Sequence, residues 1–256
     1  MIEKEANSKS LVAFTRIFQS RGLEGIWLHL LNIWFDQIRE IDTCERHQTE
    51  GVIKTYVTTS QASIKQSLGY AINYLYKNEI DKSFNFIELG AGKGKVIIIL
   101  KELILKKYNI NLYILAIEID KLLCKILKEN LYKTGFFFDS DENLIMKPTN
   151  SFKFNIKIKV IPEAIESVKS KDEFNKLIDS GRNIFYCCDS LPKENLLNLV
   201  KQISKGKNNS RSITNLLIYA NPRYLDDLLL KFGNGVNLIN QKLGVPQESY
   251  AILAIQ

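Results

Sequence analysis

The sequence predicts an α/β fold with a mostly parallel sheet and helices on both of its faces. Three observations support this prediction. Residues 84–89 form a short apolar run with an acid near its end, followed by a glycine-rich turn. Residues 95–107 have the length and composition of a helix, and residues 111–118 form a second apolar run that ends in an acid. A strand, a helix and a strand in this order form a βαβ unit, which requires a parallel sheet.

The glycine-rich turn occupies residues 88–95 and reads ELGAGKGK. Three glycines within five residues permit a sharp bend and a close ligand, because no Cβ atom blocks either. The helix that follows directs free N–H groups and a partial positive charge toward the turn. We therefore expect a ligand here; the alternative is a strand-to-helix connection that binds nothing.

The spacing of the turn separates the candidate ligands. A phosphate-binding P-loop needs Ser or Thr after its Gly-Lys pair, but Val96 follows Gly94-Lys95. The dinucleotide fingerprint G-x-G-x-x-G places its third glycine one residue later than this chain does. Glu88 also lies two residues before the first glycine, where it would repel a pyrophosphate. Both phosphate-binding interpretations are therefore disfavoured.

The composition indicates one large globular domain, or a domain with an appendage. The chain has 256 residues, 45% of them hydrophobic, and a net charge of +7. The lysines are spread along the chain and no aromatic-basic platform is visible, so nucleic acid is not expected as a partner. Four cysteines without metal-ligand spacing predict reduced thiols and no metal site. No membrane-spanning run and no signal-peptide core are found, so we expect a cytoplasmic protein.

Two regions are expected from the order of the patterns. Residues 1–80 are predicted to be a helical N-terminal extension with two apolar helical stripes separated at Gly22. Packing on the main domain is the first interpretation of this extension, and a lid or substrate wall is the second. Residues 81–256 are predicted to be the core domain, with an insertion at 134–154 that contains a short hairpin. Thr59 and Ser60 are candidate N-caps of the helix before that domain.

Acidic or polar residues recur where the predicted strands end. They are Glu88, Glu118, Glu163, Asp189 and Asn221. In an open α/β sheet this edge is where ligands bind. Glu118 is interpreted as the acceptor for both hydroxyls of a ribose. Asp120 competes for this role, but it is expected to cap the helix at 121–133. Glu163 is either an acceptor for an adenine amino group or the first residue of a helix.

The pattern E-x-G-x-G-x-G resembles motif I of class I S-adenosylmethionine (SAM) methyltransferases. SAM has no phosphate and carries sulfonium and ammonium groups, so a carboxylate beside the turn suits it. More narrowly, the chain is similar to bacterial and organellar families related to the non-SET protein-lysine methyltransferases. The likeness covers roughly residues 34–255. It is carried by FIELGAGKGKV at 86–96, YVTT at 56–59, IEID at 117–120 and YANPRY at 219–224.

The resemblance implies a Rossmann-like, seven-stranded sheet with an antiparallel last strand. It also implies SAM as the cofactor, with S-adenosylhomocysteine as the product. The residues implied in cofactor binding are Tyr56, Thr59, Glu88, Gly90, Ala91, Gly92, Gly94, Glu118, Ile119, Glu163 and Asp189.

The residues after the fourth core strand depart from the family pattern. Many relatives have an Asn-Pro-Phe-type tip there, which faces the acceptor, whereas this chain reads DSLP at 189–192. Asp189 could hold or deprotonate an amine or hydroxyl, or it could cap the next helix. Tyr56 and Tyr224 are the weaker candidates for acceptor contact.

The expected activity is methyl transfer to nitrogen or oxygen, on a protein lysine or other amine, or on a small molecule. The alternatives are a catalytically silent SAM-binding scaffold and an NAD- or nucleotide-binding enzyme.

Overall fold

The computed structural model describes a chain of two compact units, residues 1–44 and 45–256. The described residues are 2–43, 59–76, 83–108, 110–146, 155–164, 167, 172–179, 182–188, 191–205, 214–244 and 248–255. Helix α2 (Gln61–Tyr76) lies in the second unit, where it packs on the sheet and on the first sheet helix.

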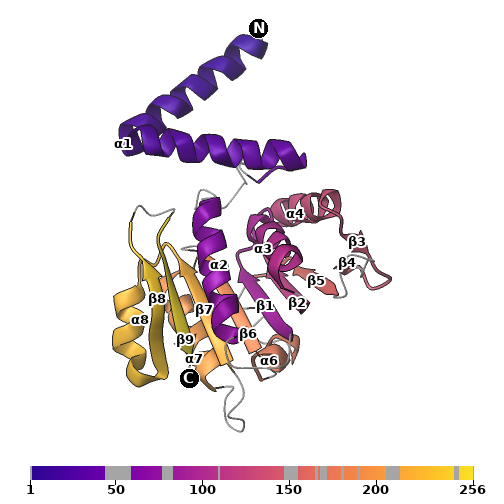
Figure 1. Ribbon diagram of the computed structural model, residues 1–256, viewed down its shortest axis with the longest axis vertical. Coiled ribbons are helices and arrows are strands. Elements are labelled where there is room, and N and C mark those ends of the chain that lie inside the picture. The colour runs from indigo at the N-terminus through magenta and orange to yellow at the C-terminus, as the bar shows by residue number, and fades with distance from the viewer. Residues whose placement is uncertain are drawn as a thin grey trace. The chain divides into compact units, whose positions relative to one another are not determined.

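Helix α1 (Ile2–Arg39) makes up most of the first unit and bends sharply at Gly22 (Figure 1). Gly22 has φ 61° and ψ −155°, a conformation that is open almost only to glycine. The bend falls between the two predicted helical stripes. Near the end of the helix, the carboxylate of Asp36 accepts hydrogen bonds from the backbone N–H and the hydroxyl of Thr43, which lies beyond the helix. These bonds fold the end of the unit back onto its helix.

One nine-stranded sheet forms the centre of the second unit (Figure 1). Its strands are β1 (Ser83–Leu89), β2 (Asn111–Ile117), β3 (Phe137–Phe138), β4 (Leu144–Met146), β5 (Ile156–Ile161), β6 (Arg182–Cys188), β7 (Thr214–Ala220), β8 (Val236–Lys242) and β9 (Tyr250–Ile255). Their spatial order is β3-β4-β5-β2-β1-β6-β7-β9-β8. Strands β5, β2, β1, β6 and β7 are parallel. Strand β9 is antiparallel to both of its neighbours.

The prediction of seven mostly parallel strands needs correction. The described residues contain nine strands, because the predicted insertion supplies the hairpin β3–β4. Strand β4 pairs antiparallel with β5 and so covers what would otherwise be the exposed edge of the parallel strands. Antiparallel pairs therefore extend the sheet at both edges, and only its centre is parallel.

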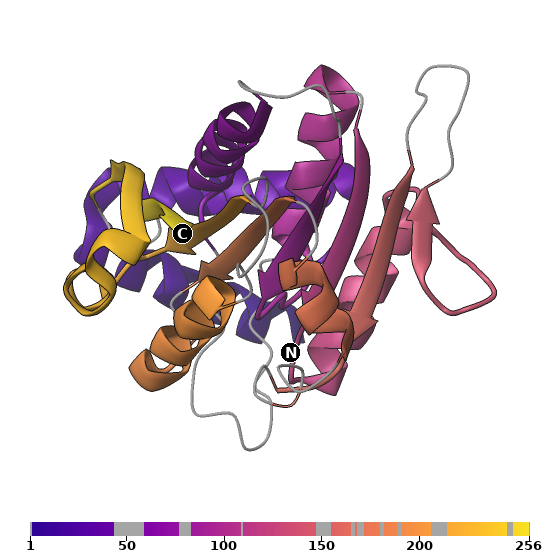
Figure 2. The same ribbon diagram turned by 90° about the horizontal axis from the view of Figure 1, so that it is seen from below.

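Helices cover both faces of the sheet, with α2 and α3 on one face and α7 on the other (Figure 2). The remaining helices are α3 (Lys95–Lys107), α4 (Lys121–Lys133), α6 (Asp172–Asp179), α7 (Lys193–Lys205) and α8 (Leu225–Phe232). Ile87 and Leu89 of β1 belong to the core cluster formed with α6, α7 and α8. Because side chains alternate along a strand, Glu88 points to the opposite face. Among the described residues, no helix has both the length and the apolar character needed to cross a bilayer.

A row of three asparagines fixes the register in the centre of the sheet. Asn85, Asn183 and Asn215 are register partners on β1, β6 and β7. The Asn85 amide donates to Asn183 Oδ1 at 2.9 Å, and the Asn183 amide donates to Asn215 Oδ1 at 2.8 Å. A slip of one residue would break both bonds and move each side chain to the other face. The row therefore aligns the carboxyl ends of these strands.

Candidate functional site

The site lies at the edge of the sheet where the parallel strands end. Glu88 is the penultimate residue of β1, and Glu118 directly follows β2. Glu163 lies two residues beyond β5, and Asn221 directly follows β7 with a positive φ of 53°. Parallel pairing brings these ends to one edge, as expected from the sequence. Asp189 lies outside the described residues.

The glycine turn has the backbone conformation that its sequence predicts. Gly90, Gly92 and Gly94 all have positive φ, at 77°, 53° and 83°. Residues with a Cβ atom adopt such angles only with strain. The N–H groups of Gly90 and Ala91 both donate to the carbonyl of Ile117, each at 2.9 Å. The turn is therefore held against the end of β2.

Helix α4 packs against the far end of this turn. A Cβ atom added to Gly94 would lie 3.2 Å from Leu127 Cγ, a tight contact in addition to the strained φ. The Asn130 amide donates to the carbonyl of Lys93 at 3.0 Å. Gly94 is also the N-cap residue of α3. Two independent requirements, backbone angle and space, therefore call for glycine at this position.

The carboxylate of Glu118 joins the turn to the start of α4. Its Oε2 accepts from the N–H of Gly92 at 2.8 Å, and its Oε1 accepts from the N–H of Asp120 at 3.0 Å. Burial raises the pKa of Glu118, although hydrogen bonds from the backbone of Asp120, Gly92 and Ile119 oppose that change. A carboxylate offers about four lone-pair sites, so the group can accept a further hydrogen bond. Asp120 instead caps α4, because it accepts from the N–H groups of Leu122 and Leu123.

Glu88 is a buried carboxylate with an unsatisfied oxygen. Its side chain is 2% exposed. Its Oε2 has no hydrogen-bond partner among the described residues. Burial raises the pKa of Glu88 well above its usual value, and the neighbouring Glu118 raises it further. A buried charged oxygen without a partner is unfavourable, so this atom calls for a cationic or hydrogen-bonding ligand.

Tyr186 is a site residue that was not predicted from the sequence. It is the register partner of Glu88 on β6, and its hydroxyl is buried. Burial raises the pKa of Tyr186, and the nearby Cys188 and Glu88 add to the shift, while the Thr59 hydroxyl opposes it. A tyrosine inside the apolar run at 184–187 has the pattern of a core residue. Only its register with Glu88 indicates a role at the site.

The other predicted residues are distributed unevenly around this edge. Thr59 lies on the β6 side, with its hydroxyl 3.5 Å from the sulfur of Cys188. Ile119 follows Glu118 and is 63% exposed, so it offers an apolar surface beside the carboxylate. Glu163 is half-buried. Tyr56 lies outside the described residues.

Tyr224 lies on a different face of the sheet from the Glu88 side chain. It packs against the core cluster on the α7 and α8 face of the sheet. Its backbone N–H donates to the hydroxyl of Tyr219 at 3.4 Å, at the start of α8. The described contacts therefore give Tyr224 a structural role. They do not bring it to Glu88 and Glu118.

Comparison with known proteins gives similar folds at low identity. No protein-family model matches the chain. No curated protein matches it either. One similar solved structure is magnesium protoporphyrin IX methyltransferase from Synechocystis PCC 6803 with bound SAM, at 12% identity and TM-score 0.44. The match covers 76% of this chain and 80% of that one.

Two further structures are similar to a comparable extent. An rRNA methyltransferase from Streptomyces viridochromogenes is 9% identical with TM-score 0.47, over 82% of this chain and 88% of that one. A precorrin-6y C5,15-methyltransferase from Geobacter metallireducens is 16% identical with TM-score 0.40, over 84% and 97%. At these identities and scores, the chemistry of this chain has to be argued from its own residues.

Proposed function

We propose that this chain is a SAM-dependent methyltransferase that acts on a nitrogen or oxygen acceptor. The observation that carries the proposal is the buried oxygen of Glu88, which has no hydrogen-bond partner among the described residues, beside a turn of three positive-φ glycines. A ligand seated there meets the glycine backbone and this carboxylate oxygen. Such a site favours a nucleoside that carries positive charge.

The charge of the site disfavours diphosphate ligands. Glu118 lies close enough to Glu88 to disfavour its ionisation, since Glu118 raises the pKa of Glu88. A pyrophosphate would add two negative charges to this pair, whereas the sulfonium and ammonium groups of SAM would offset it. This argument separates the proposal from its rival, an NAD- or nucleotide-binding enzyme.

The residues at the strand ends fit the parts of SAM. Glu88 and the glycine turn would hold the amino-acid end, together with Thr59 and, by resemblance, Tyr56. Glu118 would accept hydrogen bonds from the ribose hydroxyls. Ile119 and Glu163 would contact the adenine. When bound, SAM supplies an activated methyl group.

The part of the chain near the acceptor has to align it, exclude water and remove a proton. We assign acceptor contact to Asp189, with Tyr56 as a weaker candidate. A protein lysine or another amine is the first proposal for the acceptor, which follows the likeness to the non-SET protein-lysine methyltransferases. A small-molecule acceptor is the second.

Calorimetric titration with SAM, S-adenosylhomocysteine and NAD tests the ligand. We expect micromolar or tighter binding of the first two only, and a preference for NAD would overturn the proposal.

Glu118→Ala should weaken SAM binding by about 1–3 kcal/mol, because the ribose hydroxyls lose their acceptor. Unchanged affinity would remove Glu118 from the ribose role.

Incubation of cell extract with the protein and methyl-labelled SAM, followed by mass spectrometry, tests the activity and identifies the acceptor. Acceptor-dependent formation of S-adenosylhomocysteine separates a transferase from a catalytically silent scaffold.

The variant Asp189→Asn should keep its affinity for SAM and lose methyl transfer. Loss of affinity together with transfer would assign Asp189 to cofactor binding instead.

A further inference from the structure

A second concave surface lies on the side of α4 that faces away from the glycine turn. Leu127 and Asn130 contact the turn. At 3.6 residues per turn, Lys121, Lys125, Lys128 and Tyr132 lie on roughly the opposite side of the helix. Together with Phe138 of the hairpin and Pro162 after β5, these four residues line a cavity of about 650 Å³. We call this surface the α4 groove.

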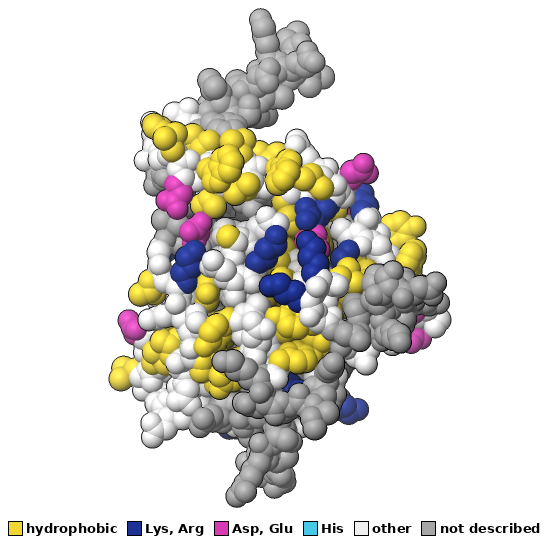
Figure 3. Space-filling view, in the orientation of Figure 1, with side chains coloured by type: hydrophobic (Ala, Val, Ile, Leu, Met, Phe, Trp, Pro, Cys, Tyr) yellow, Lys and Arg dark blue, Asp and Glu magenta, His cyan; other side chains and the backbone are white. Residues whose placement is uncertain are grey.

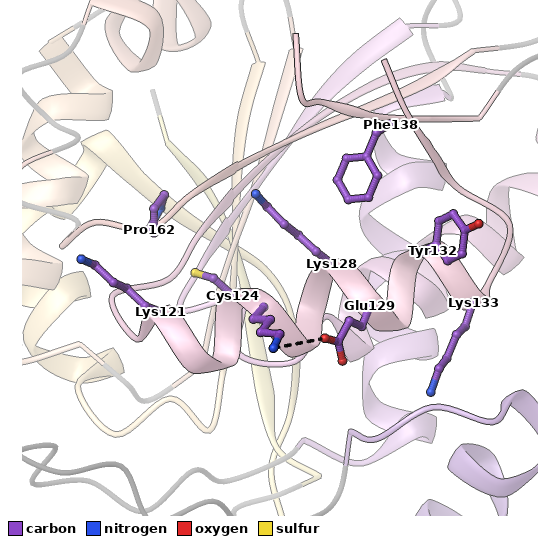
Figure 4. Close-up of a pocket in the computed structure, with 9 residues that line it drawn as sticks. Lys121, Cys124, Lys128, Glu129, Tyr132, Lys133, Phe138 and Pro162 are labelled. Carbon is purple, nitrogen blue, oxygen red and sulfur yellow. Dashed lines mark ion pairs between the residues drawn. The ribbon is translucent and has the colours of Figure 1, made fainter. Parts of the chain in front are cut away.

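The α4 groove is positively charged. Four lysines line it and only one acid, Glu129. The side chains of Lys121 and Lys128 make no ion pair or hydrogen bond with any described residue. Lys125 pairs with Glu129 at 4.0 Å (Figure 4), and both side chains are more than half exposed, so the pair contributes little. Figure 3 shows basic side chains gathered over the region of α3 and α4. The groove therefore suits an anion.

The lysines are spaced along the helix. The rise of 1.5 Å per residue separates Lys121 from Lys125 by about 6 Å and Lys125 from Lys128 by about 4.5 Å along the axis. A row of charges at this spacing fits a chain of anionic groups better than one isolated anion. An extended phosphodiester backbone supplies such a chain.

Two aromatic rings stand at one end of the groove. Tyr132 is 58% exposed and Phe138 is 50% exposed. In Figure 4, Phe138 lies over the Tyr132 end of α4, and Lys128 extends between Phe138 and Pro162. The rings come from two different elements, α4 and β3, and only the fold of the hairpin over the helix places them together beside the lysines. Exposed rings beside lysines can stack on unpaired bases.

We propose that the α4 groove binds single-stranded nucleic acid, with its lysines along the phosphates and Tyr132 and Phe138 against the bases. An acidic peptide would satisfy the lysines but has no flat bases for the rings. The surface of a bilayer would not reach rings that line a concave wall. The lysines and rings of the α4 groove are different residues from those proposed to bind SAM.

Fluorescence anisotropy with a labelled 12-nucleotide oligouridine and the full chain tests the proposal. The triple variant Lys121→Gln, Lys125→Gln, Lys128→Gln should weaken binding at least 10-fold. It should also reduce the slope of log K against log salt by about 2, since each phosphate contact contributes about 0.7. Phe138→Ala should weaken binding between about 5-fold and 150-fold through lost stacking. Glu129→Gln should strengthen binding, an effect that misfolding cannot produce.

The matched control removes three exposed lysines elsewhere, Lys201→Gln, Lys205→Gln and Lys231→Gln, so that the net charge changes equally. Equal weakening in control and groove variants would overturn the proposal, as would equal affinity for duplex RNA or no oligonucleotide binding at low salt. Vesicles of phosphatidylserine and a polyglutamate peptide serve as competitors. If either ligand loses binding in the groove variant while oligouridine does not, the groove belongs to that ligand.

Discussion

Glu88 occupies an unfavourable position in the folded chain without a ligand. Its carboxylate is buried, one oxygen has no partner among the described residues, and a second carboxylate raises its pKa further. Each of these features opposes ionisation. Strongly shifted groups of this kind gather at functional sites. The stability of the chain without a ligand should therefore depend on the protonation of Glu88.

The variant Glu88→Gln tests this dependence. Because burial raises the pKa of Glu88 in the folded chain, the folded state binds this proton more tightly than the unfolded state does. The resulting stability is present below the ordinary carboxyl pKa of 4.5 and is lost as pH rises through the raised value. The loss is about 1.4 kcal/mol for each tenfold difference between the acid dissociation constants of the two states. We expect ligand-free Glu88→Gln to be more stable than the wild type at pH values above that raised pKa.

Thermal melting of both proteins without ligand, from about pH 5 to about pH 9, measures the effect. The difference in stability between variant and wild type should grow with pH, while SAM affinity of the variant falls. A difference that stays constant with pH would show that Glu88 keeps its ordinary pKa.

The glycine turn and the two helices beside it form the element on which the site depends. Gly94 caps α3 in a left-handed conformation, and its missing Cβ atom leaves room for Leu127 of α4. Gly92 donates to Glu118, and Gly90 is held by Ile117. Each glycine therefore has a different task, although all three share a positive φ.

Two glycine-to-alanine variants distinguish backbone strain in the folded state from the conformational entropy of the unfolded chain. Gly94→Ala should destabilise the chain by about 1–3 kcal/mol, because φ is 83° and Leu127 lies close. Gly69→Ala should stabilise it by about 0.5–1 kcal/mol, because Gly69 lies within α2 with nothing near its missing Cβ atom. Urea unfolding gives both values. Similar losses in the two variants would contradict the role assigned to the turn.

Local features of this element could be predicted from the sequence. The bounds of α3 and α4 matched the prediction, and so did the cap at Asp120, because helix caps and glycine turns depend on near neighbours in the chain. Features that depend on distant pairing were missed. The short hairpin in the insertion was expected, but its addition to the sheet was not, because that depends on the pairing of Leu144 and its neighbours with β5. Tyr186 likewise reaches the site only through its register with Glu88.

At the scale of the whole molecule, the division into two units determines how the chain should unfold. The first unit ends at residue 44, and it contains both tryptophans, Trp27 and Trp34. Sheet and helix content of the described residues lies mainly in the second unit. Tryptophan fluorescence therefore reports on one unit, and far-UV circular dichroism reports mostly on the other.

Urea unfolding of the full chain should give different midpoints by these two probes. The fragment 45–256 should keep a single cooperative transition, with the midpoint that circular dichroism gives for the full chain, because its sheet and both helix layers are complete. Two results together would show that the two units unfold as one cooperative structure. The full chain would give the same midpoint by fluorescence and by circular dichroism, and the fragment 45–256 would be unfolded without urea.

The carboxylate of Glu118 also links two surfaces that have different proposed ligands. It holds Gly92 on one side and Asp120 on the other, and Asp120 holds the first amides of α4. A hydroxyl that competes for Glu118 will change how firmly those amides are protected from solvent deuterium. Exchange at Leu122 and Leu123 should therefore respond to SAM, while exchange at Leu228 in α8 should not. The same coupling would carry occupancy at the glycine turn to Lys121, where the α4 groove begins.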